Sequence, residues 1–285
     1  MDLDVVVCVK NQAENLDRLL RQIVHQVPFE NLIVIYGTST DETQKVAEKY
    51  TNKVFWDEDK GLGAARNLGI LKASSEIVAM IDSDVILGEN WYNQLIENMQ
   101  DPKTAAAIGT CLFGYGCQPI ETYWEFIRHT GENNWACHST MFRRELVLKV
   151  GNFDESIKGA GEDYDLFLRL QKAGYKWVWV REANVYQPTS VARYFKHLNW
   201  WIQGTPFMDD VLRQLTTISL SRYYCREMLL VIKSFWVIFR VSFSENPTLM
   251  LSYPTMMAAM AYARISGLKK LMSAGYIPRP EGNPR

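Results

Sequence analysis

The sequence predicts an α/β protein in which a mostly parallel sheet is flanked by helices and followed by a helical extension. Up to about residue 190, short apolar runs rich in β-branched residues alternate with amphipathic segments. Parallel strands need crossover connections, which helices of this kind provide. After residue 190 the alternation gives way to long, aromatic helical stretches. We therefore expect two regions, 1–190 with the sheet and 191–285 with helices.

The first strand and helix are expected at the N-terminus. Residues 3–9 (LDVVVCV) form a β-branched run, and Asn11 with Glu14 has the spacing of a capping box. Apolar residues then recur at steps of three and four, at Leu16, Leu19, Leu20, Ile23, Val24 and Val27. Such a stripe predicts a helix packed on a sheet, ending at Pro28.

Further elements continue the series. Residues 31–36 (NLIVIY) and 77–81 (IVAMI) are expected to be buried strands, and a helix should begin near Thr40-Asp41. We also expect a strand at 105–112 and a helix at 161–173. A sheet built in this way gathers its ligands at the carboxyl ends of its strands.

Composition and charge narrow the class of protein. The chain has 285 residues, 47% hydrophobic and 22% charged, which is typical of a folded protein. The net charge of −1 hides an asymmetry, because residues 213–285 carry 10 Lys/Arg against 3 Asp/Glu. Since the basic tail is also apolar and aromatic, it favours a membrane surface over nucleic acid as partner.

The cysteines and the N-terminus indicate the compartment. The five cysteines form no CxxC pair and are odd in number, so we expect neither a disulfide framework nor a structural zinc site. The N-terminal MDLDVVVCVK has two acids and a short apolar run, unlike a secretory signal. We therefore expect a cytoplasmic protein with reduced thiols.

Two C-terminal stretches suggest contact with a membrane. Residues 228–243 are largely apolar, with cations seven residues apart along one helix face at Arg226, Lys233 and Arg240. Residues 247–263 carry no charge but contain Pro254. Both are near the lower limit for a span, so interfacial or re-entrant helices are expected over 222–272, peripheral or monotopic on the cytoplasmic face. The alternative is a core or dimer helix pair.

The chemistry is expected at Asp82-Ser83-Asp84, directly after the strand at 77–81. Two carboxylates one residue apart can reach a single Mg²⁺ or Mn²⁺, and such ions also take phosphate oxygens as ligands. Alone, the pattern also fits two solvated acids at a strand end. Two further segments add context. In GLGAARNLGI at 61–70, the glycines allow close backbone approach, and Arg66 and Asn67 are expected to open a helix. In GAGEDYDLFLRLQKAGY at 159–175, three acids lie at a helix start.

Together these segments resemble the family 2 inverting glycosyltransferases of the GT-A fold. The resemblance covers residues 3 to about 190, and it rests also on VVVCVKNQAENL, IVIYGTSTDET and FRRELVLKVGNFDE. It implies a UDP- or GDP-sugar donor and a divalent cation, Mg²⁺ or Mn²⁺. It also implies roles for individual residues: Asp163 as general base, Asp84 and Asp82 as metal ligands, and Val9, Asn11, Tyr36, Arg66, Asn67, Asp82 and Ser83 as donor contacts.

The sequence departs from the family pattern at three places. Tyr36-Gly37 stands where relatives usually carry two acids, and Gln12 stands where an acid is common. Gln187 stands where many relatives have a histidine metal ligand. These changes leave the identity of the donor open and place more of the cation binding on Asp84.

Several other side chains are candidates for contacts with the acceptor, the metal or a membrane. Glu162, Trp135 and Arg143 are expected near the acceptor, although Arg143-Arg144 also fits an exposed helix start. His138 and His197 are expected to be structural rather than metal ligands. Trp200 and Trp201, beside the basic tail, suggest an interfacial aromatic belt.

The function expected from these observations is transfer of a sugar from a nucleotide diphosphate to a lipid-linked acceptor at the cytoplasmic membrane face. A soluble enzyme with a glycan or protein acceptor is one alternative. A non-catalytic sugar-nucleotide-binding scaffold is another, suggested by Tyr36-Gly37 and Gln187. A nucleotidyltransferase is disfavoured, because no basic, glycine-rich loop follows the first strand.

Overall fold

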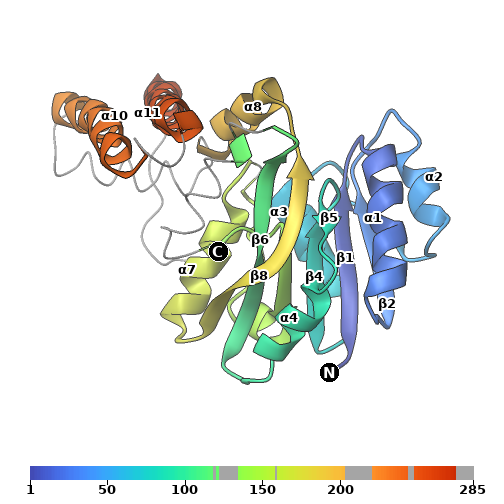
Figure 1. Cartoon of the computed structure of the whole chain (residues 1–285). Coiled ribbons are helices and arrows are strands. Elements are labelled where there is room, and N and C mark those ends of the chain that lie inside the picture. Colours follow the sequence, from blue (N-terminus) through green and yellow to red (C-terminus); the bar gives the residue numbers. More distant parts are fainter. Residues whose placement is uncertain (118–119, 122–133, 158, 203–219, 243–246, 274–285) are drawn as a thin grey trace.

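An eight-stranded sheet forms the centre of the molecule (Figure 1). The computed structural model describes residues 1–117, 120–121, 134–157, 159–202, 220–242 and 247–273. In chain order the strands are β1 (Leu3–Val9), β2 (Asn31–Tyr36), β3 (Val54–Trp56), β4 (Ile77–Asp82), β5 (Ile86–Leu87), β6 (Thr104–Tyr115), β7 (Ser139–Arg143) and β8 (Lys176–Pro188). Their order across the sheet is β3-β2-β1-β4-β7-β6-β8-β5.

The helices follow the alternation that the sequence predicts. They are α1 (Ala13–Gln26), α2 (Thr43–Glu48), α3 (Leu62–Lys72), α4 (Trp91–Asn98), α6 (Arg144–Lys149), α7 (Glu162–Lys172), α8 (Val191–Ile202), α10 (Leu220–Ser242) and α11 (Pro247–Ser273). The expected strands at 3–9, 31–36, 77–81 and 105–112 and the expected helix at 161–173 are confirmed.

The sheet is mixed rather than mostly parallel. β1 pairs with β2 and β4 in parallel, β2 with β3, and β6 with β8. β7 runs antiparallel to both β4 and β6, and β5 runs antiparallel to β8. β7 therefore joins two parallel units, and the carboxyl ends of β1, β2 and β4 lie together at one edge.

Alternating burial along β1 shows how the sheet separates two cores. Val5 and Val7 point to a cluster that includes the apolar stripe of α1, whereas Val6 points to the opposite cluster beneath α3 and α7. A Cβ at Gly69 would lie 2.5 Å from Cγ1 of Val6, so the glycine lets α3 pack closely on β1. This close packing fixes α3, and with it Arg66, against the strands.

Two local expectations are wrong. Asn11 does not cap α1, because its backbone has φ 52° and its Oδ1 accepts a hydrogen bond from the amide of Thr40 at 2.7 Å instead. The N-cap of that helix is Gln12, whose side chain makes no capping hydrogen bond. Arg66 does not open a helix either: α3 begins at Leu62, after Gly61 with φ 106°. Arg66 therefore lies one turn inside the helix.

The C-terminal helices lie beyond the carboxyl edge of the sheet, at the top of Figure 1. α11 contains Pro254 within its length and packs against both α10 and α8. Tyr194 of α8 and Met256 of α11 share a small apolar cluster with Phe113 of β6. In the part of the chain that the structure describes, no helix is sufficiently long and apolar to cross a bilayer.

Candidate active site

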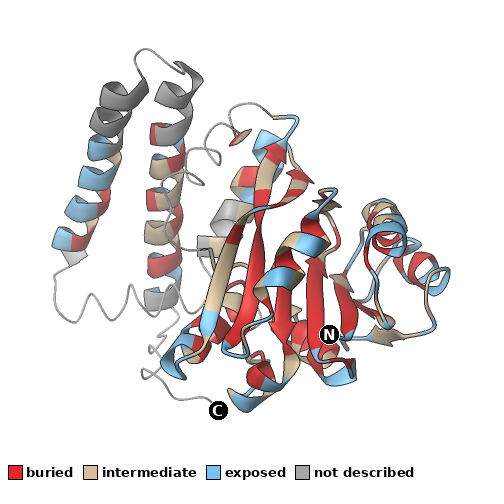
Figure 2. Cartoon of the chain, turned by 60° about the horizontal axis from the view of Figure 1, so that its bottom comes forward, coloured by how far each residue is buried: buried red, intermediate tan, exposed pale blue. Residues whose placement is uncertain are grey.

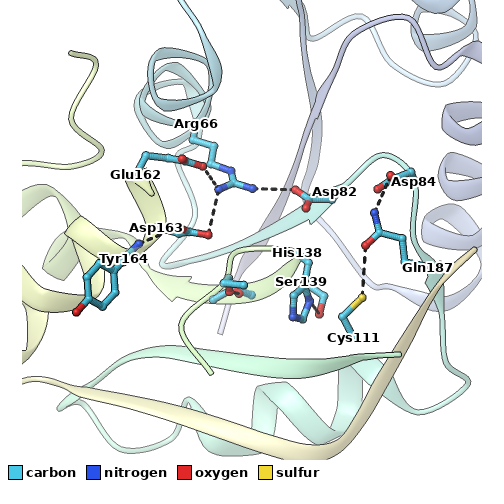
Figure 3. A network of polar contacts seen from close by, with 12 residues as sticks. Arg66, Asp82, Asp84, Cys111, His138, Ser139, Glu162, Asp163, Tyr164 and Gln187 are labelled. Carbon is cyan, nitrogen blue, oxygen red and sulfur yellow. Dashed lines mark hydrogen bonds and ion pairs between the residues drawn. The ribbon is translucent and has the colours of Figure 1, made fainter. Parts of the chain in front are cut away.

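Arg66 is the centre of a buried ionic cluster (Figure 3). Its side chain is 4% exposed; Nη2 donates to Oδ1 of Asp82 at 2.9 Å, and Nη1 donates to Oε1 of Glu162. Nη1 also lies 3.9 Å from Oδ2 of Asp163. One guanidinium thus joins the end of β4 to the start of α7, which is geometry that a rigid planar fork provides.

The first turn of α7 presents the two acids. Gly161 takes the left-handed conformation before the helix, and Glu162 and Asp163 follow at once. The amide of Tyr164 donates to Oδ1 of Asp163 at 2.8 Å. Burial raises the pKa of Asp163, opposed by Arg66 and by these amide contacts. A carboxylate with a raised pKa is a better proton acceptor, so Asp163 has the properties of a general base.

Asp82 and Glu162 hold the other two positions around Arg66. Burial raises the pKa of Asp82 to about 6, partly offset by Arg66. Burial raises the pKa of Glu162 to about 8, again opposed by Arg66. Both shifts come mainly from desolvation of the ionised form. The cluster is therefore a tightly packed set of acids around a single cation.

Asp84 lies apart from this cluster, in a second polar group. Nε2 of Gln187 donates to Oδ2 of Asp84 at 2.7 Å, and Sγ of Cys111 donates to Oε1 of Gln187 at 3.6 Å (Figure 3). From α8, Nη2 of Arg193 lies 3.6 Å from the same Oδ2. Gln187, at the position where many relatives of the resembled family have a histidine, thus orients Asp84 through a hydrogen bond.

The two aspartates fit a divalent cation that relies on its substrate. Mg²⁺ and Mn²⁺ prefer oxygen ligands and are commonly held by one or two carboxylates plus phosphate oxygens. The hydrogen bonds from Arg66 and Gln187 occupy one carboxylate oxygen of each aspartate, Oδ1 of Asp82 and Oδ2 of Asp84. Among the described residues, no group of three or more His, Cys, Asp or Glu side chains is placed to hold a metal. A cation here would take most of its ligands from a diphosphate and water.

Most of the other residues predicted to contact the donor lie at the same edge of the sheet as the aspartates. Val9 and Tyr36 are paired at the ends of β1 and β2, and Asn11 follows β1. Cys8 of β1 pairs with Asp82, which places these residues one and two strands from the aspartates. Ser83 is buried between the aspartates. The remaining predicted contact, Asn67, instead donates to the carboxylate of Glu155.

The structure separates the predicted acceptor residues. Trp135 packs on Tyr164, with ring centroids 5.0 Å apart, beside Asp163. The prediction for Arg143 is wrong: β7 is antiparallel to β4, so Arg143 pairs with Ile77 at the opposite edge of the sheet. There it is buried and bonds to the carboxylate of Glu76. Its role is to tie β7 to that edge.

His138 and His197, which the sequence predicts to be structural, lie in different surroundings. Burial lowers the pKa of His138 to about 3, and its Nδ1 lies 2.9 Å from Oγ of Ser139. His138 is therefore neutral and hydrogen-bonded beside the site. His197 lies on α8, one turn after Arg193, and its pKa is lowered mainly by burial.

Sequence reasoning missed Arg193. The residue has no motif of its own, and it reaches Asp84 from α8, the helix that follows β8 and Gln187 in the chain. Its spacing from Gln187, six residues across a strand end and a helix start, gives no periodic signal. The contact depends on tertiary packing.

The pH dependence of stability should report the state of Glu162. An unfolded carboxyl has its ordinary pKa of 4.5, whereas the folded value is about 8, so the folded protein binds more protons between these values. The free energy of unfolding is then lost as pH rises from about 5 through 8. We expect Glu162→Gln to reduce this slope in urea titrations at several pH values.

The exposed Glu97→Gln on α4 serves as the control and should leave the slope unchanged. An unchanged slope in Glu162→Gln would show that Glu162 is ionised throughout this range.

Comparison with known proteins agrees with the fold. The family model described as glycosyl transferase family 2 matches residues 4–157. The chain therefore belongs to glycosyl transferase family 2.

Two curated relatives and one solved structure are similar to it. Glycosyltransferase AglE of Haloferax volcanii is 26% identical over 199 residues, covering 64% of this chain and 65% of AglE. The glucosyl-dolichyl phosphate glucuronosyltransferase of the same organism is 25% identical over 187 residues, covering 58% and 59%. The matched stretch thus spans less than two thirds of either relative.

The solved structure is the mannosyltransferase PcManGT of Pyrobaculum calidifontis in complex with GDP-Man and Mn²⁺. It is 17% identical, with a TM-score of 0.54, and the likeness covers 97% of this chain and 76% of that one. At this identity the likeness shows the shared fold.

Proposed function

We propose that this chain is an inverting glycosyltransferase that moves a sugar from a nucleotide diphosphate to an acceptor. The observation that carries the proposal is the bridge made by Arg66, which links Asp82 on the donor side to Asp163 on the acceptor side. A single-displacement transfer needs charge stabilisation at the leaving diphosphate and a base on the opposite face of the reacting carbon. The two ends of this cluster provide both.

Each residue has a distinct part in the proposed reaction. Asp84, oriented by Gln187, and Asp82 hold the divalent cation, which when bound offsets the charge of the leaving diphosphate. Asp163 accepts the proton of an acceptor hydroxyl, as on a lipid-linked glycan; toward a lipid phosphate, whose oxygen is already ionised, it positions the acceptor. Glu162 and Arg66 position Asp163 without contacting the substrate, because both are almost fully buried.

The acceptor is proposed to be lipid-linked, such as a polyprenyl phosphate or lipid-linked glycan, used at the cytoplasmic face of the membrane. Support comes from the similarity to the glucosyl-dolichyl phosphate glucuronosyltransferase and from the basic, apolar C-terminal helices. We also propose a division into a catalytic domain, 1–190, and a helical region, 191–285. The boundary falls between β8 and α8.

The donor and the base are tested by binding and transfer together. A panel of UDP- and GDP-sugars, each with Mg²⁺ or Mn²⁺, should include one donor that raises the melting temperature, because a ligand specific for the folded state stabilises it. With that donor, Asp163→Asn should retain the stabilisation and lose about 10²–10⁴-fold in transfer rate to a lipid-linked glycan acceptor, whose hydroxyl must give up a proton.

Asp165→Asn, two residues further along α7, is a matched control that alters another acid of the same turn. Stabilisation by no member of the panel, or transfer by Asp163→Asn at the wild-type rate, would overturn the assignment.

A further inference from the structure

The outer side of α10 is an apolar and cationic surface. Among the residues of α10 whose side chains the structure describes, the large exposed apolar ones are Met228, Leu229, Leu230 and Ile232, at 56%, 54%, 37% and 50% exposure. Arg222, Arg226 and Lys233 are also exposed on this helix. At 100° per residue, Met228, Ile232 and Leu229 form a strip, and the three cations form a neighbouring strip along the helix. Figure 2 shows this exposed side facing away from the sheet.

The acidic side chain of α10, Glu227, is buried and does not reach this surface. Glu227 is the single acidic residue in the sequence of α10 and α11, and its side chain is 1% exposed. Its Oε2 lies 3.3 Å from Nε of Arg264 on α11, and its Oε1 lies 3.5 Å from Arg226. The buried pair joins the two helices and leaves the outer side of α10 with positive charge and no carboxylate.

The position of this surface relates it to the site. α11 packs on α8, and Arg193 of α8 reaches Asp84. α10 lies beyond the same edge of the sheet as the aspartates, whereas the N-terminus lies at the opposite edge (Figure 1). A flat partner that covers α10 would therefore approach the carboxyl edge of the sheet, where the acceptor must enter.

We propose that the outer side of α10 docks on the surface of a bilayer that contains anionic phospholipids, with the helix lying along the interface. This inference rests on the proposed function only for the reason why the protein would bind a membrane. The binding itself depends on the side chains of α10. An apolar strip beside a row of cations suits burial among acyl chains and contact with anionic headgroups. A second copy packed by a twofold axis would set cations against cations, which disfavours that occupant. The docking surface is narrower than residues 222–272, because α11 turns Met256, Ala261 and Leu268 inward.

Vesicle binding tests the inference without donor or acceptor, so its outcome is independent of the proposed activity. The full chain is sedimented with phosphatidylcholine vesicles, with and without phosphatidylglycerol. We expect strong binding only with phosphatidylglycerol. Ile232→Glu should weaken binding by about tenfold or more, since burying one large apolar side chain contributes at least that factor. Lys233→Gln should weaken it by about fivefold, the contribution of one cation near an anionic surface.

Matched controls lie on the sheet domain. Val24→Glu on α1, at 49% exposure, repeats the apolar-to-acid change, and the exposed Lys103→Gln repeats the loss of a cation. Both should bind like wild type. Circular dichroism melting confirms that each variant folds. Equal binding by Ile232→Glu and wild type would overturn the proposal. So would a wild-type dimer that ignores vesicles and becomes a monomer in Ile232→Glu.

Discussion

Asp84→Ala should reduce kcat/KM for sugar transfer on the order of 10³-fold, which is the scale of losing a group that stabilises charge in the transition state. The structure explains why this residue dominates. Oδ1 of Asp82 is already occupied by Arg66, whereas Asp84 is held by the neutral amide of Gln187 and lies near Arg193. More of the cation binding therefore falls on Asp84.

The defect should be visible in binding as well as in rate. Isothermal titration of the nucleoside diphosphate with Mg²⁺ or Mn²⁺ should show weaker, less metal-dependent binding in Asp84→Ala, while the unfolding temperature changes little because the side chain is not in the Arg66 cluster. Glu89→Ala removes an exposed acid that follows β5, where the chain runs antiparallel to β8, and is the control. Metal-dependent binding that survives Asp84→Ala at wild-type strength would assign the cation to other ligands.

Arg66→Met should destabilise the fold by about 3–5 kcal/mol and abolish transfer. Removing one partner of a buried ion pair leaves the other charge without compensation: ionised Asp82 loses its cation, and so does Glu162 above about pH 8, where it is ionised. Below that pH Glu162 still loses the hydrogen bond from the guanidinium. For a chain of this size that loss corresponds to roughly 10 °C in melting temperature. Arg66→Lys should recover the fold only in part, because an ammonium cannot reproduce the planar fork that spans β4 and α7.

Two variants separate charge from packing in this prediction. Melted above pH 8, where Glu162 is ionised, the double variant Arg66→Met with Glu162→Gln should recover much of the lost stability, since no uncompensated Glu162 remains, but should not recover transfer. Arg21→Met removes an arginine that pairs with Asp17 on the surface, and it should change the melting temperature little. Arg66→Met with wild-type melting would mean that the cluster contributes nothing to the fold.

The amino-terminal half of the fold follows from local patterns. The β-branched runs at β1, β2 and β4 and the apolar stripe of α1 are each encoded within one short segment, so the strands and helices were predictable. The position of Asp82 and Asp84 at a carboxyl edge follows from strand direction alone. What local patterns do not encode is the order of strands.

The antiparallel insertion of β7 shows that limit. Its pairing with β4 joins Ile77 to Arg143, residues far apart in the chain, and it sends Arg143 to the wrong edge for an acceptor contact. Arg66 is a second example. It is expected to contact the nucleotide, but in the structure three acids enclose it, and two of them come from α7. The contact of Arg193 with Asp84 likewise depends on the docking of α8. Each is a product of tertiary packing rather than of sequence period.

The sequence separation of 96 positions between Arg66 and Glu162 also matters while the protein is being made. At ribosomal rates of roughly 5–20 residues per second, Arg66 precedes its carboxylate by about 5–20 seconds. During that interval β1, β2 and β4 are already synthesised, and the guanidinium has only Asp82 among its eventual partners. The guanidinium of Arg66 therefore stays hydrated until α7 leaves the ribosome. Its contacts with Glu162 and Asp163 then form together, late in synthesis.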